Sequence, residues 1–172
     1  MNSKPRVSVL MTVYNAGPFL RESVDSLLAQ SFPAWELVAV DDGSTDGSAA
    51  VLAGYNDPRI KVFSFPKNLG RTPALRHAFG QASGEYVAVL DADDISHPDR
   101  LKRQVEFLDS RPDVVLVGTW AERIDEQGRV IDHWQPPVRA EELYDRLGWL
   151  NPIVHSSAMY RKEAAEAAGG YP

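Results

Sequence analysis

Short apolar runs rich in branched residues alternate along the chain with segments in which apolar residues recur at helical spacing. Continuous apolar runs of this length are typical of strands that are buried on both faces. The third run alternates apolar and polar residues, which favours a place nearer the edge of a sheet. The strands predicted in this way are residues 7–13, 35–42, 60–65, 85–91 and 113–120.

Helical patterns separate these strands. The first helix begins near Pro18 and ends before Pro33, because proline fits a first helical turn but not a helix interior. Further helices are predicted within residues 43–55 after a Ser/Asp capping signal, at residues 72–82, and from Pro98 onward. Such alternation predicts an α/β fold with a mainly parallel central sheet and helices on both faces.

The pattern weakens after Trp120. The segment "RIDEQGRVIDHW" predicts a hairpin around Gly128. A helix at residues 139–150, a strand at 153–160 and a short helix ended by Gly169 complete the prediction.

Composition narrows the class of protein. The 172 residues suit one domain with a substantial core, and 44% hydrophobic with 24% charged residues is an ordinary globular composition. The net charge is −6 and no Lys/Arg cluster stands out, so we expect no nucleic-acid partner. The absence of cysteine excludes disulfides and thiolate metal sites. The N-terminus is neither a signal peptide nor a membrane span, so we expect a cytoplasmic location and leave peripheral contact with a membrane open.

Polar residues directly follow four of the predicted strands. In open parallel sheets, ligands bind outside the carboxyl ends of the strands. We therefore expect these side chains to meet at one edge, and their convergence is more informative than any single motif. The residues are Thr12, Tyr14 and Asn15 after the first strand, Asp41 and Asp42 after the second, Asn68 and Arg71 after the third, and Asp91 and Asp93 after the fourth.

The DxD motif "DAD" places Asp91 and Asp93 on the same side of a strand end. Crowded carboxylates raise one another's pKa unless a cation neutralises them. Mg²⁺ or Mn²⁺ is commonly held by one or two carboxylates together with substrate phosphates and water, so the pair suggests a cation that bridges to a diphosphate. The alternative is an acidic turn that caps the helix at Pro98 through Asp94 or Ser96.

Other candidates also allow two interpretations. Asp41 or Asp42 could accept hydrogen bonds from a nucleobase or ribose, or could cap the next helix. Arg71 and Arg76 could neutralise a diphosphate, or could lie on a solvated helix face. His155 could be a metal ligand, or a packed and hydrogen-bonded residue. The tryptophans at positions 120, 134 and 149 could form a sugar platform, or could pack in the core or at an edge.

The ordered segments of the chain resemble the family 2 glycosyltransferases, nucleotide-sugar enzymes with the GT-A fold. The segments that carry the resemblance are "VSVLMTVYNAGPFLRESVDSLLAQSF", "ELVAVDDGSTDGS", "NLGRTPALRHAF", "GEYVAVLDADDISHPDRL" and "NPIVHSSAMYRKEA". The resemblance covers nearly the whole chain, in order and spacing. It implies a single GT-A (Rossmann-like) domain.

The resemblance also implies an inverting transfer of a sugar from a nucleotide diphosphate, with UDP-sugars as the expected donors, to a saccharide or lipid-linked saccharide acceptor in polysaccharide biosynthesis. It implies roles for each candidate site residue. Thr12, Tyr14, Asn15 and Asp42 would bind the nucleobase and nearby donor atoms, Asp91 the ribose, Arg71 the diphosphate, and Asp93 with His155 a divalent cation, Mn²⁺ or Mg²⁺.

One part of the family pattern lies outside this sequence. These enzymes need a general base to deprotonate the acceptor hydroxyl, and in the family a carboxylate for this task follows a segment like "GGYP". Here that segment ends at Pro172, so we expect the catalytic base beyond it. We interpret residues 1–120 as the donor-binding half and residues 121–172 as an incomplete start of the acceptor-binding half. Such a truncated chain would bind a nucleotide-sugar and a metal ion but transfer the sugar poorly or not at all.

Two other functions remain open at this point. A phosphatase of the haloacid-dehalogenase type also uses a DxD, but usually after its first strand and with a Thr where this chain has Ile95. A receiver-like or other non-catalytic nucleotide-binding module would also suit Asp41 and Asp42 on a parallel sheet. The sequence has no G-x-G-x-x-G, no G-x-x-x-x-G-K-[ST] and no G-x-S-x-G motif.

Overall fold

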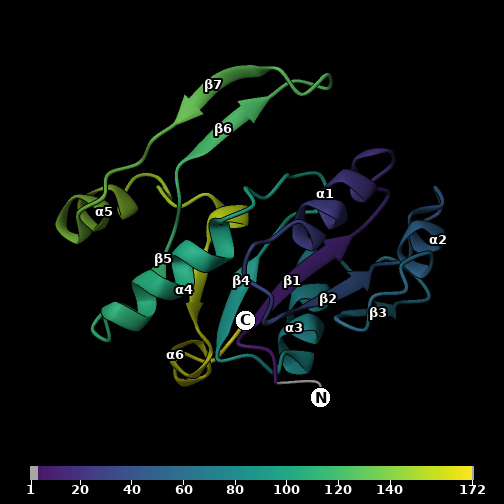
Figure 1. The fold of residues 1–172 in the computed structure, drawn as a ribbon, viewed down its shortest axis with the longest axis horizontal. Coiled ribbons are helices and arrows are strands. Elements are labelled where there is room, and N and C mark those ends of the chain that lie inside the picture. Colours follow the sequence, from purple (N-terminus) through teal and green to yellow (C-terminus); the bar gives the residue numbers. More distant parts are fainter. Residues whose placement is uncertain (1–3, 172) are drawn as a thin grey trace.

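The central sheet is built around β1 (Val7–Val13). This strand pairs in parallel with β2 (Trp35–Asp41) on one side and with β4 (Tyr86–Val89) on the other. β3 (Ile60–Ser64) pairs with β2 and forms one edge of the sheet, as its alternating pattern predicted. Figure 1 shows this arrangement in the computed structural model, which describes residues 4–171.

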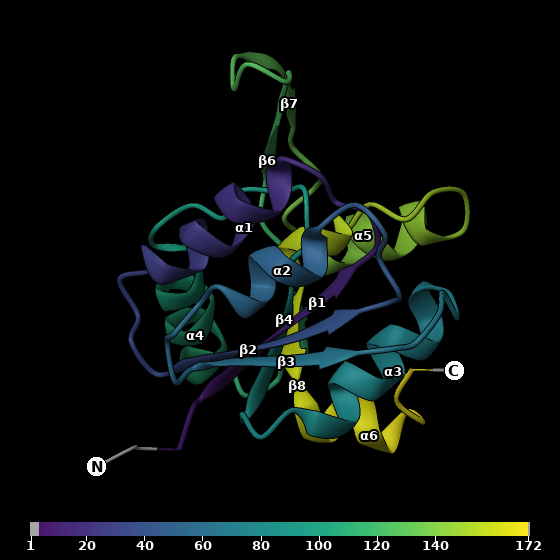
Figure 2. The same cartoon turned by 90° about the vertical axis from the view of Figure 1, so that its right-hand side faces the viewer.

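Helices cover both faces of the sheet, so the predicted α/β fold is confirmed (Figure 2). α1 (Phe19–Leu28), α2 (Ser48–Ala53) and α4 (Arg100–Ser110) contribute apolar side chains to the larger core cluster. α3 (Arg71–Gln81) packs against the other face with Ala74, Leu75 and Ala78. The central strands contribute side chains to both core clusters, because successive side chains along a strand point to opposite faces of the sheet.

The far edge of the sheet differs from the prediction. A strand was expected at residues 113–120, but β5 contains only Leu116–Val117. β5 pairs with β8 (Met159–Arg161), which lies antiparallel between β5 and β4 and gives the strand order β3-β2-β1-β4-β8-β5. The pairing is short: Leu116 lies opposite Tyr160, and Val117 lies opposite Met159.

The strand predicted at residues 153–160 is also wrong over residues 153–158, since β8 begins only at Met159. Residues His155–Ser157 form a 3₁₀ turn. The Ser157 hydroxyl and its own N–H both donate to the Val154 carbonyl, at 2.8 and 3.0 Å. Serine favours such local hydrogen bonds to the backbone, and here they take the place of the hydrogen bonds that a strand would make with its neighbour in the sheet.

The segment between β5 and the 3₁₀ turn projects beyond the sheet (Figure 1). β6 (Ala121–Ile124) and β7 (Val130–Trp134) form the predicted hairpin, with Gly128 in its turn at φ +75° (Figure 1). α5 (Ala140–Leu147) follows the hairpin and buries none of its residues. α6 (Lys162–Ala167) ends before Gly169, as predicted. Met1–Ser3 and Pro172, at the ends of the two predicted halves, lie outside the described residues.

A buried carboxylate joins the sheet strands at their amino ends. Glu36 of β2 accepts hydrogen bonds from the Ser8 hydroxyl at 2.6 Å and from the Ser83 N–H and hydroxyl, both at 2.8 Å. Lys61 of β3 lies 2.6 Å from its other oxygen. Burial alone would raise the pKa of Glu36, yet the hydrogen bonds from Lys61, Ser8 and Ser83 outweigh burial and lower it.

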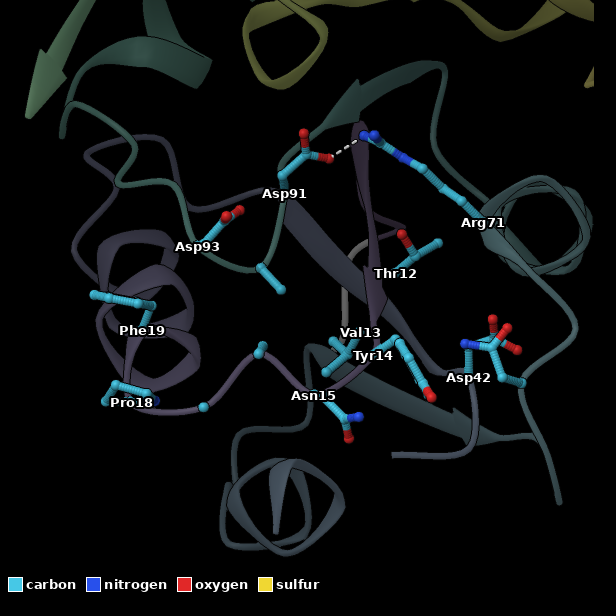
Figure 3. A pocket seen from close by; sticks show the side chains of 14 residues that line it. Thr12, Val13, Tyr14, Asn15, Pro18, Phe19, Asp42, Arg71, Asp91 and Asp93 are labelled. Atoms are coloured by element: carbon cyan, nitrogen blue, oxygen red, sulfur yellow. Dashed lines mark hydrogen bonds and ion pairs between the residues drawn. The ribbon is translucent and has the colours of Figure 1, made fainter. Parts of the chain in front are cut away.

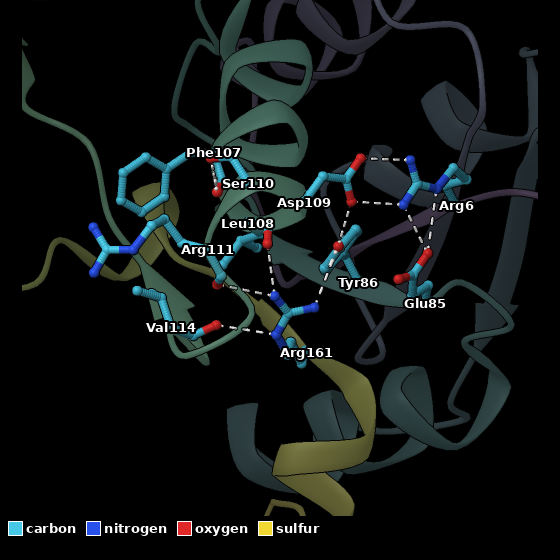
Figure 4. Close-up of polar contacts among 10 residues, drawn as sticks. All are labelled: Arg6, Glu85, Tyr86, Phe107, Leu108, Asp109, Ser110, Arg111, Val114 and Arg161. Atoms are coloured by element: carbon cyan, nitrogen blue, oxygen red, sulfur yellow. Dashed lines mark hydrogen bonds and ion pairs between the residues drawn. The ribbon is translucent and has the colours of Figure 1, made fainter.

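A second polar cluster ties β8 and α4 to the same end of the sheet (Figure 4). The Arg161 guanidinium donates to the carbonyls of Leu108 and Val114, at 2.7 and 3.0 Å. Asp109 accepts from the Tyr86 hydroxyl at 2.6 Å and from the Arg6 guanidinium at 2.8 and 2.9 Å. These contacts attach the C-terminal end of α4 to β1, β4 and β8.

We expect Asp109→Asn to destabilise the protein in a pH-dependent way. The Arg6 guanidinium lowers the pKa of Asp109 to about 2. The ionised carboxyl therefore stabilises the fold above its unfolded pKa of about 3.9, and this contribution disappears as the pH falls through about 2. Because the pair is partly exposed, we expect a loss of about 1 kcal/mol at pH 7.

Urea denaturation of both proteins between pH 7 and pH 2 measures this difference. The gap should narrow as the pH falls from about 5 to about 2. Asp145→Asn, on the exposed α5, serves as the control and should show little change at any pH. A pH-independent gap for Asp109→Asn would contradict the assignment.

Candidate functional site

A cleft of about 640 Å³ opens at the carboxyl ends of β1, β2 and β4. Figure 3 shows that side chains from several strand ends point into this first cleft. The sequence predicted this convergence, and all four strand ends contribute expected residues to the cleft. Asp41 is the exception among them, because it is buried and does not line the cleft. The predicted residues that line the first cleft are Thr12, Tyr14, Asn15, Asp42, Asn68, Arg71, Asp91 and Asp93.

Tyr14 and Asn15 lie in the loop that follows β1. The Tyr14 side chain is 52% exposed, which leaves its ring available to a ligand. Asn15 adopts a left-handed backbone conformation, with φ +50°, which asparagine tolerates better than most residues. Its Oδ1 accepts the Thr45 N–H at 2.8 Å, so part of its polar capacity serves the loop itself.

Asp42 holds the start of α3. Its two carboxylate oxygens accept the N–H groups of Leu69 and Gly70, each at 2.8 Å, and Gly70 immediately precedes α3. Each oxygen keeps a further lone pair, so these bonds leave Asp42 able to accept from a ligand. One interpretation of the sequence was that Asp41 or Asp42 caps the following helix. Instead, Asp41 accepts the Ser44 N–H in the turn, at 3.2 Å, and Asp42 is bonded to the start of the more distant α3.

Gly43 lets two loops approach closely. Its φ is +72°, and a Cβ at this position would lie 2.5 Å from the carbonyl carbon of Lys67. Glycine is needed here both for the left-handed conformation and for the space. The contact fixes the segment 67–70 that leads to Arg71.

Arg71 and Asp91 line the first cleft and contact His155, which itself lines neither cleft. The Arg71 guanidinium forms an ion pair with Asp91 (Figure 3) and lies 2.7 Å from Nδ1 of His155. The same Nδ1 lies 3.3 Å from Asp91 Oδ1. Burial would raise the pKa of Asp91, but the adjacent His155 side chain and the Arg71 charge outweigh burial and lower it.

Asp93 and Asp94 face different clefts. Asp93 lines the first cleft, whereas Asp94 lines a second one of about 760 Å³. Loss of water around its carboxyl raises the pKa of Asp94, and the charges of Asp91 and Asp93 act in the same direction. Neither Asp94 nor Ser96 caps α4; the Leu101 N–H donates to Gln30 Oε1 at 3.0 Å instead.

The second cleft lies between the turn after β4, the 3₁₀ turn and the β6–β7 hairpin. Its walls include Asp94, Ser156, Trp120, Glu122 and His133. His133 and Glu122 face each other across the hairpin, with Nδ1 and Oε1 3.5 Å apart. The two clefts therefore share the turn at residues 90–94 as a common wall.

Several other candidates lie elsewhere. Arg76 donates to the Tyr171 carbonyl at 3.2 Å and does not line the first cleft. Trp134 donates to the Pro152 carbonyl at 3.4 Å. Trp149 is 94% exposed and lines neither cleft, whereas Trp120 lines the second.

The described residues contain no ready-made cage for a metal ion. Within residues 4–171, no three His, Asp or Glu side chains are grouped as ligands. A cation held by one or two carboxylates and otherwise by substrate phosphates and water needs no such cage. The exposed Asp93 in the first cleft fits that kind of site.

The fold and the first cleft define an α/β protein with an open cleft at the carboxyl edge of a mainly parallel sheet, where such folds bind their ligands. The model of glycosyl transferase family 2 matches residues 8–169. This chain therefore belongs to glycosyl transferase family 2, as the ordered segments predicted. The match favours this family over the haloacid-dehalogenase and receiver-like alternatives.

Similar proteins support the assignment. The chain is 37% identical over 175 residues to EpsE of Bacillus subtilis (strain 168), which is named as a glycosyltransferase; the match covers 99% of this chain and 62% of EpsE. It is 44% identical over 112 residues to TuaG of the same organism, named for teichuronic acid biosynthesis, covering 64% of this chain and 44% of TuaG. This chain thus spans less than two thirds of the length of both relatives.

A solved structure shares the fold. The mannosyltransferase PcManGT from Pyrobaculum calidifontis, solved with GDP-Man and Mn²⁺, matches with a TM-score of 0.73 and 28% identity. The match covers 99% of this chain and 48% of that one. The GT-A fold expected from the sequence is confirmed.

No helix formed by residues 4–171 is long and apolar enough to cross a membrane.

We predict that Gly43→Ala destabilises the protein more than Gly128→Ala. The two glycines have nearly equal φ values, +72° and +75°, but a Cβ at Gly128 would meet nothing within 4 Å. The left-handed backbone should cost each variant about 1–2 kcal/mol. The clash with Lys67 should cost Gly43→Ala about 1–3 kcal/mol more.

Denaturant unfolding of the two variants gives the comparison directly. Equal losses of stability would show that the segment 67–70 moves away freely and is not fixed by Gly43.

Proposed function

We propose that this chain binds a nucleoside-diphosphate sugar in the first cleft and takes part in transfer of the sugar to an acceptor hydroxyl. The observation that carries the proposal is the convergence of Thr12, Asp42, Arg71, Asp91 and Asp93 on one cleft at the strand ends. The cleft combines hydrogen-bond acceptors for a nucleoside with a guanidinium for a diphosphate. Its volume of about 640 Å³ is in the range of small-molecule sites.

The residues take different roles in this proposal. Thr12, Tyr14, Asn15 and Asp42 lie nearest the β1 and β2 ends and bind the nucleobase and adjacent donor atoms. Asp91 binds the ribose, and Arg71 pairs with the diphosphate. Negative charge grows on the leaving diphosphate as the glycosidic bond breaks, and a positioned guanidinium stabilises that charge where it develops.

Asp93 and His155 would hold a divalent cation, Mn²⁺ or Mg²⁺. When bound, such an ion supplies further positive charge to the diphosphate oxygens. The complex of PcManGT with GDP-Man and Mn²⁺ supports this part of the proposal, because that protein shares both fold and family-level similarity with this chain.

His155 can serve a cation only after Arg71 moves. Arginine can only donate, so its contact at 2.7 Å requires Nδ1 of His155 to accept and places the ring proton on Nε2. A metal ion can bind the lone pair of either ring nitrogen. Here Nδ1 gives its lone pair to Arg71 and Nε2 carries the proton, so neither nitrogen is free. If Arg71 turns to a diphosphate, Nδ1–H can donate to Asp91, now 3.3 Å away, and Nε2 becomes free.

The donor and the setting are narrower proposals. We retain UDP-sugars as the expected donors, with GDP-sugars as the alternative that the PcManGT complex favours. The names of TuaG and of the succinoglycan biosynthesis protein ExoO support a role in polysaccharide biosynthesis, with a saccharide or lipid-linked saccharide as acceptor. We assign the general base to none of the described residues.

A thermal-shift panel tests donor and cation binding. UDP-, GDP- and dTDP-sugars are added with and without MnCl₂. One nucleotide should stabilise the protein in a metal-dependent way, by about 2.7 kcal/mol at roughly 100 times its Kd. Asp93→Ala should abolish the metal dependence, because it removes the exposed carboxylate of the first cleft.

Asp113→Ala is the control for this panel. Asp113 pairs with Arg111 before β5 and lines neither cleft, so its variant should respond as the wild type does. Stabilisation that survives Asp93→Ala unchanged would place the cation elsewhere. Release of phosphate from a simple phosphomonoester, without any response to nucleotide sugars, would favour a phosphatase.

We further propose that the second cleft receives the acceptor. It is built largely by residues 119–135 and 154–157, so it joins the donor half, 1–120, to the acceptor half, 121–172. Trp120 offers an aromatic face, and Glu122, His133 and Asp94 offer hydrogen bonds, a combination that suits a saccharide. The shared turn at residues 90–94 would bring acceptor and donor together.

Trp120→Ala tests this proposal against Trp149→Ala. With the donor identified in the panel and bound to the protein, the Kd of a set of mono- and disaccharides is measured by calorimetry. Trp120→Ala should raise the saccharide Kd about tenfold with donor Kd unchanged, since it removes the aromatic face of the second cleft together with the Nε1–H hydrogen bond to the Pro136 carbonyl at 3.2 Å. Trp149→Ala should behave as the wild type, because this side chain lines neither cleft. Equal effects of both variants would exclude the second cleft as the acceptor site.

A further inference from the structure

The loop after β2 hydrogen bonds to both walls of the first cleft. We define the first wall as residues 14–19 and the second wall as residues 68–71. Asp42, at the start of this loop, holds the second wall through the N–H groups of Leu69 and Gly70. The first wall is held by residues 44–46 of the same loop and by Ser48, the first residue of α2.

Five hydrogen bonds join residues 44–48 to the first wall, and the longest runs from the Thr45 hydroxyl to Asn15 Oδ1 at 3.5 Å. The Asn15 N–H donates to Ser44 Oγ at 3.0 Å, and Thr45 N–H donates back to Asn15 Oδ1 at 2.8 Å. The N–H groups of the next two residues of the wall also donate to the loop. They are Ala16 N–H to Ser48 Oγ at 3.1 Å and Gly17 N–H to Asp46 Oδ2 at 2.8 Å.

The first wall has an unusual backbone. Asn15 and Gly17 both have positive φ, +50° and +57°, in a segment of three residues. Such a path exposes consecutive N–H groups that find no partner in a helix or strand. The acceptors supplied by the loop are therefore what holds this wall in place.

Asp46 uses its two oxygens for different purposes. Oδ1 accepts the N–H and the hydroxyl of Ser48, at 3.0 and 2.6 Å, within the loop. Oδ2 crosses to Gly17. The Ser48 hydrogen bonds lower the pKa of Asp46 and the Gly17 N–H adds to this effect, so the acceptor is a carboxylate at neutral pH. Asp46 itself does not line the cleft.

We propose that Asp46 is a positioning residue of the first cleft and sets the place of the first wall through its bond to Gly17. The proposal deepens the proposed function and rests on it for its nucleotide readout. Because Asp42 and Asp46 belong to one loop, the loop fixes the two walls relative to each other. A nucleoside diphosphate then meets a preformed cleft, and less ordering accompanies binding.

Asp46→Asn separates the two uses of this side chain. The amide keeps one acceptor oxygen for Ser48 and loses the acceptor for Gly17, because its nitrogen can only donate. Amide hydrogen exchange of the ligand-free protein should show about tenfold faster exchange in a peptide that covers the first wall. With MnCl₂ present, the Kd of UDP or GDP, whichever the wild type binds, should rise about tenfold in calorimetry.

Asp125→Asn is the matched control. Asp125 accepts the N–H groups of Gln127 and Arg129, both at 2.9 Å, in the exposed turn of the β6–β7 hairpin. Its other oxygen accepts from the Arg129 guanidinium at 2.8 Å. The variant therefore also keeps one acceptor oxygen and loses the other, far along the chain from both walls. Exchange of residues 14–19 and nucleotide affinity should both stay at the wild-type values.

Each outcome decides one of the two proposals. Wild-type exchange at residues 14–19 in Asp46→Asn overturns the positioning role, as does faster exchange with unchanged Kd. A wild type that binds neither UDP nor GDP overturns the proposed function, while the exchange experiment still decides whether Asp46 holds the wall. If Asp46→Asn does not fold, Ser48→Ala removes the acceptor of Ala16 N–H and should raise exchange and Kd in the same way.

Discussion

The parallel pairing of β1 with β2 and β4 is the constraint on which the first cleft depends. The ladder aligns Val13 with Asp41 on one side and Leu10 with Val89 on the other. Because the strands run in the same direction, the residues that follow them emerge at the same edge. Asp42 and Asp91 become neighbours of the β1 loop although they are far apart in sequence.

The two ends of the sheet use polar groups in opposite ways. At the amino ends, Glu36 and Asp109 are satisfied by partners within the protein, and their low pKa values reflect those partners. At the carboxyl ends, Tyr14, Arg71 and Asp93 face a cleft. One end therefore fastens strands and helices together, and the other remains available to a ligand.

Arg71 links the structure of the first cleft to its proposed chemistry. In the described structure its guanidinium lies between Asp91 and His155, where it neutralises a carboxylate that burial would otherwise disfavour. A diphosphate and a cation would compete for these same partners. The cleft thus carries its own counter-charge, and the proposed donor complex requires the three side chains to exchange partners.

The sequence by itself determined the strand–helix alternation and the polar residues that follow each strand. The reason is that buried strands and helices differ in the spacing of their apolar residues, and this spacing also shows where each strand ends. It could not reveal that β8 enters the sheet between β4 and β5, since periodicity reports burial but not the pairing partner. Nor could it reveal that Asp42 accepts hydrogen bonds from the backbone just before α3, or that Asp93 and Asp94 face different clefts. Those features were decided by tertiary structure alone, because they depend on hydrogen bonds and turns between segments that only the folded chain brings together.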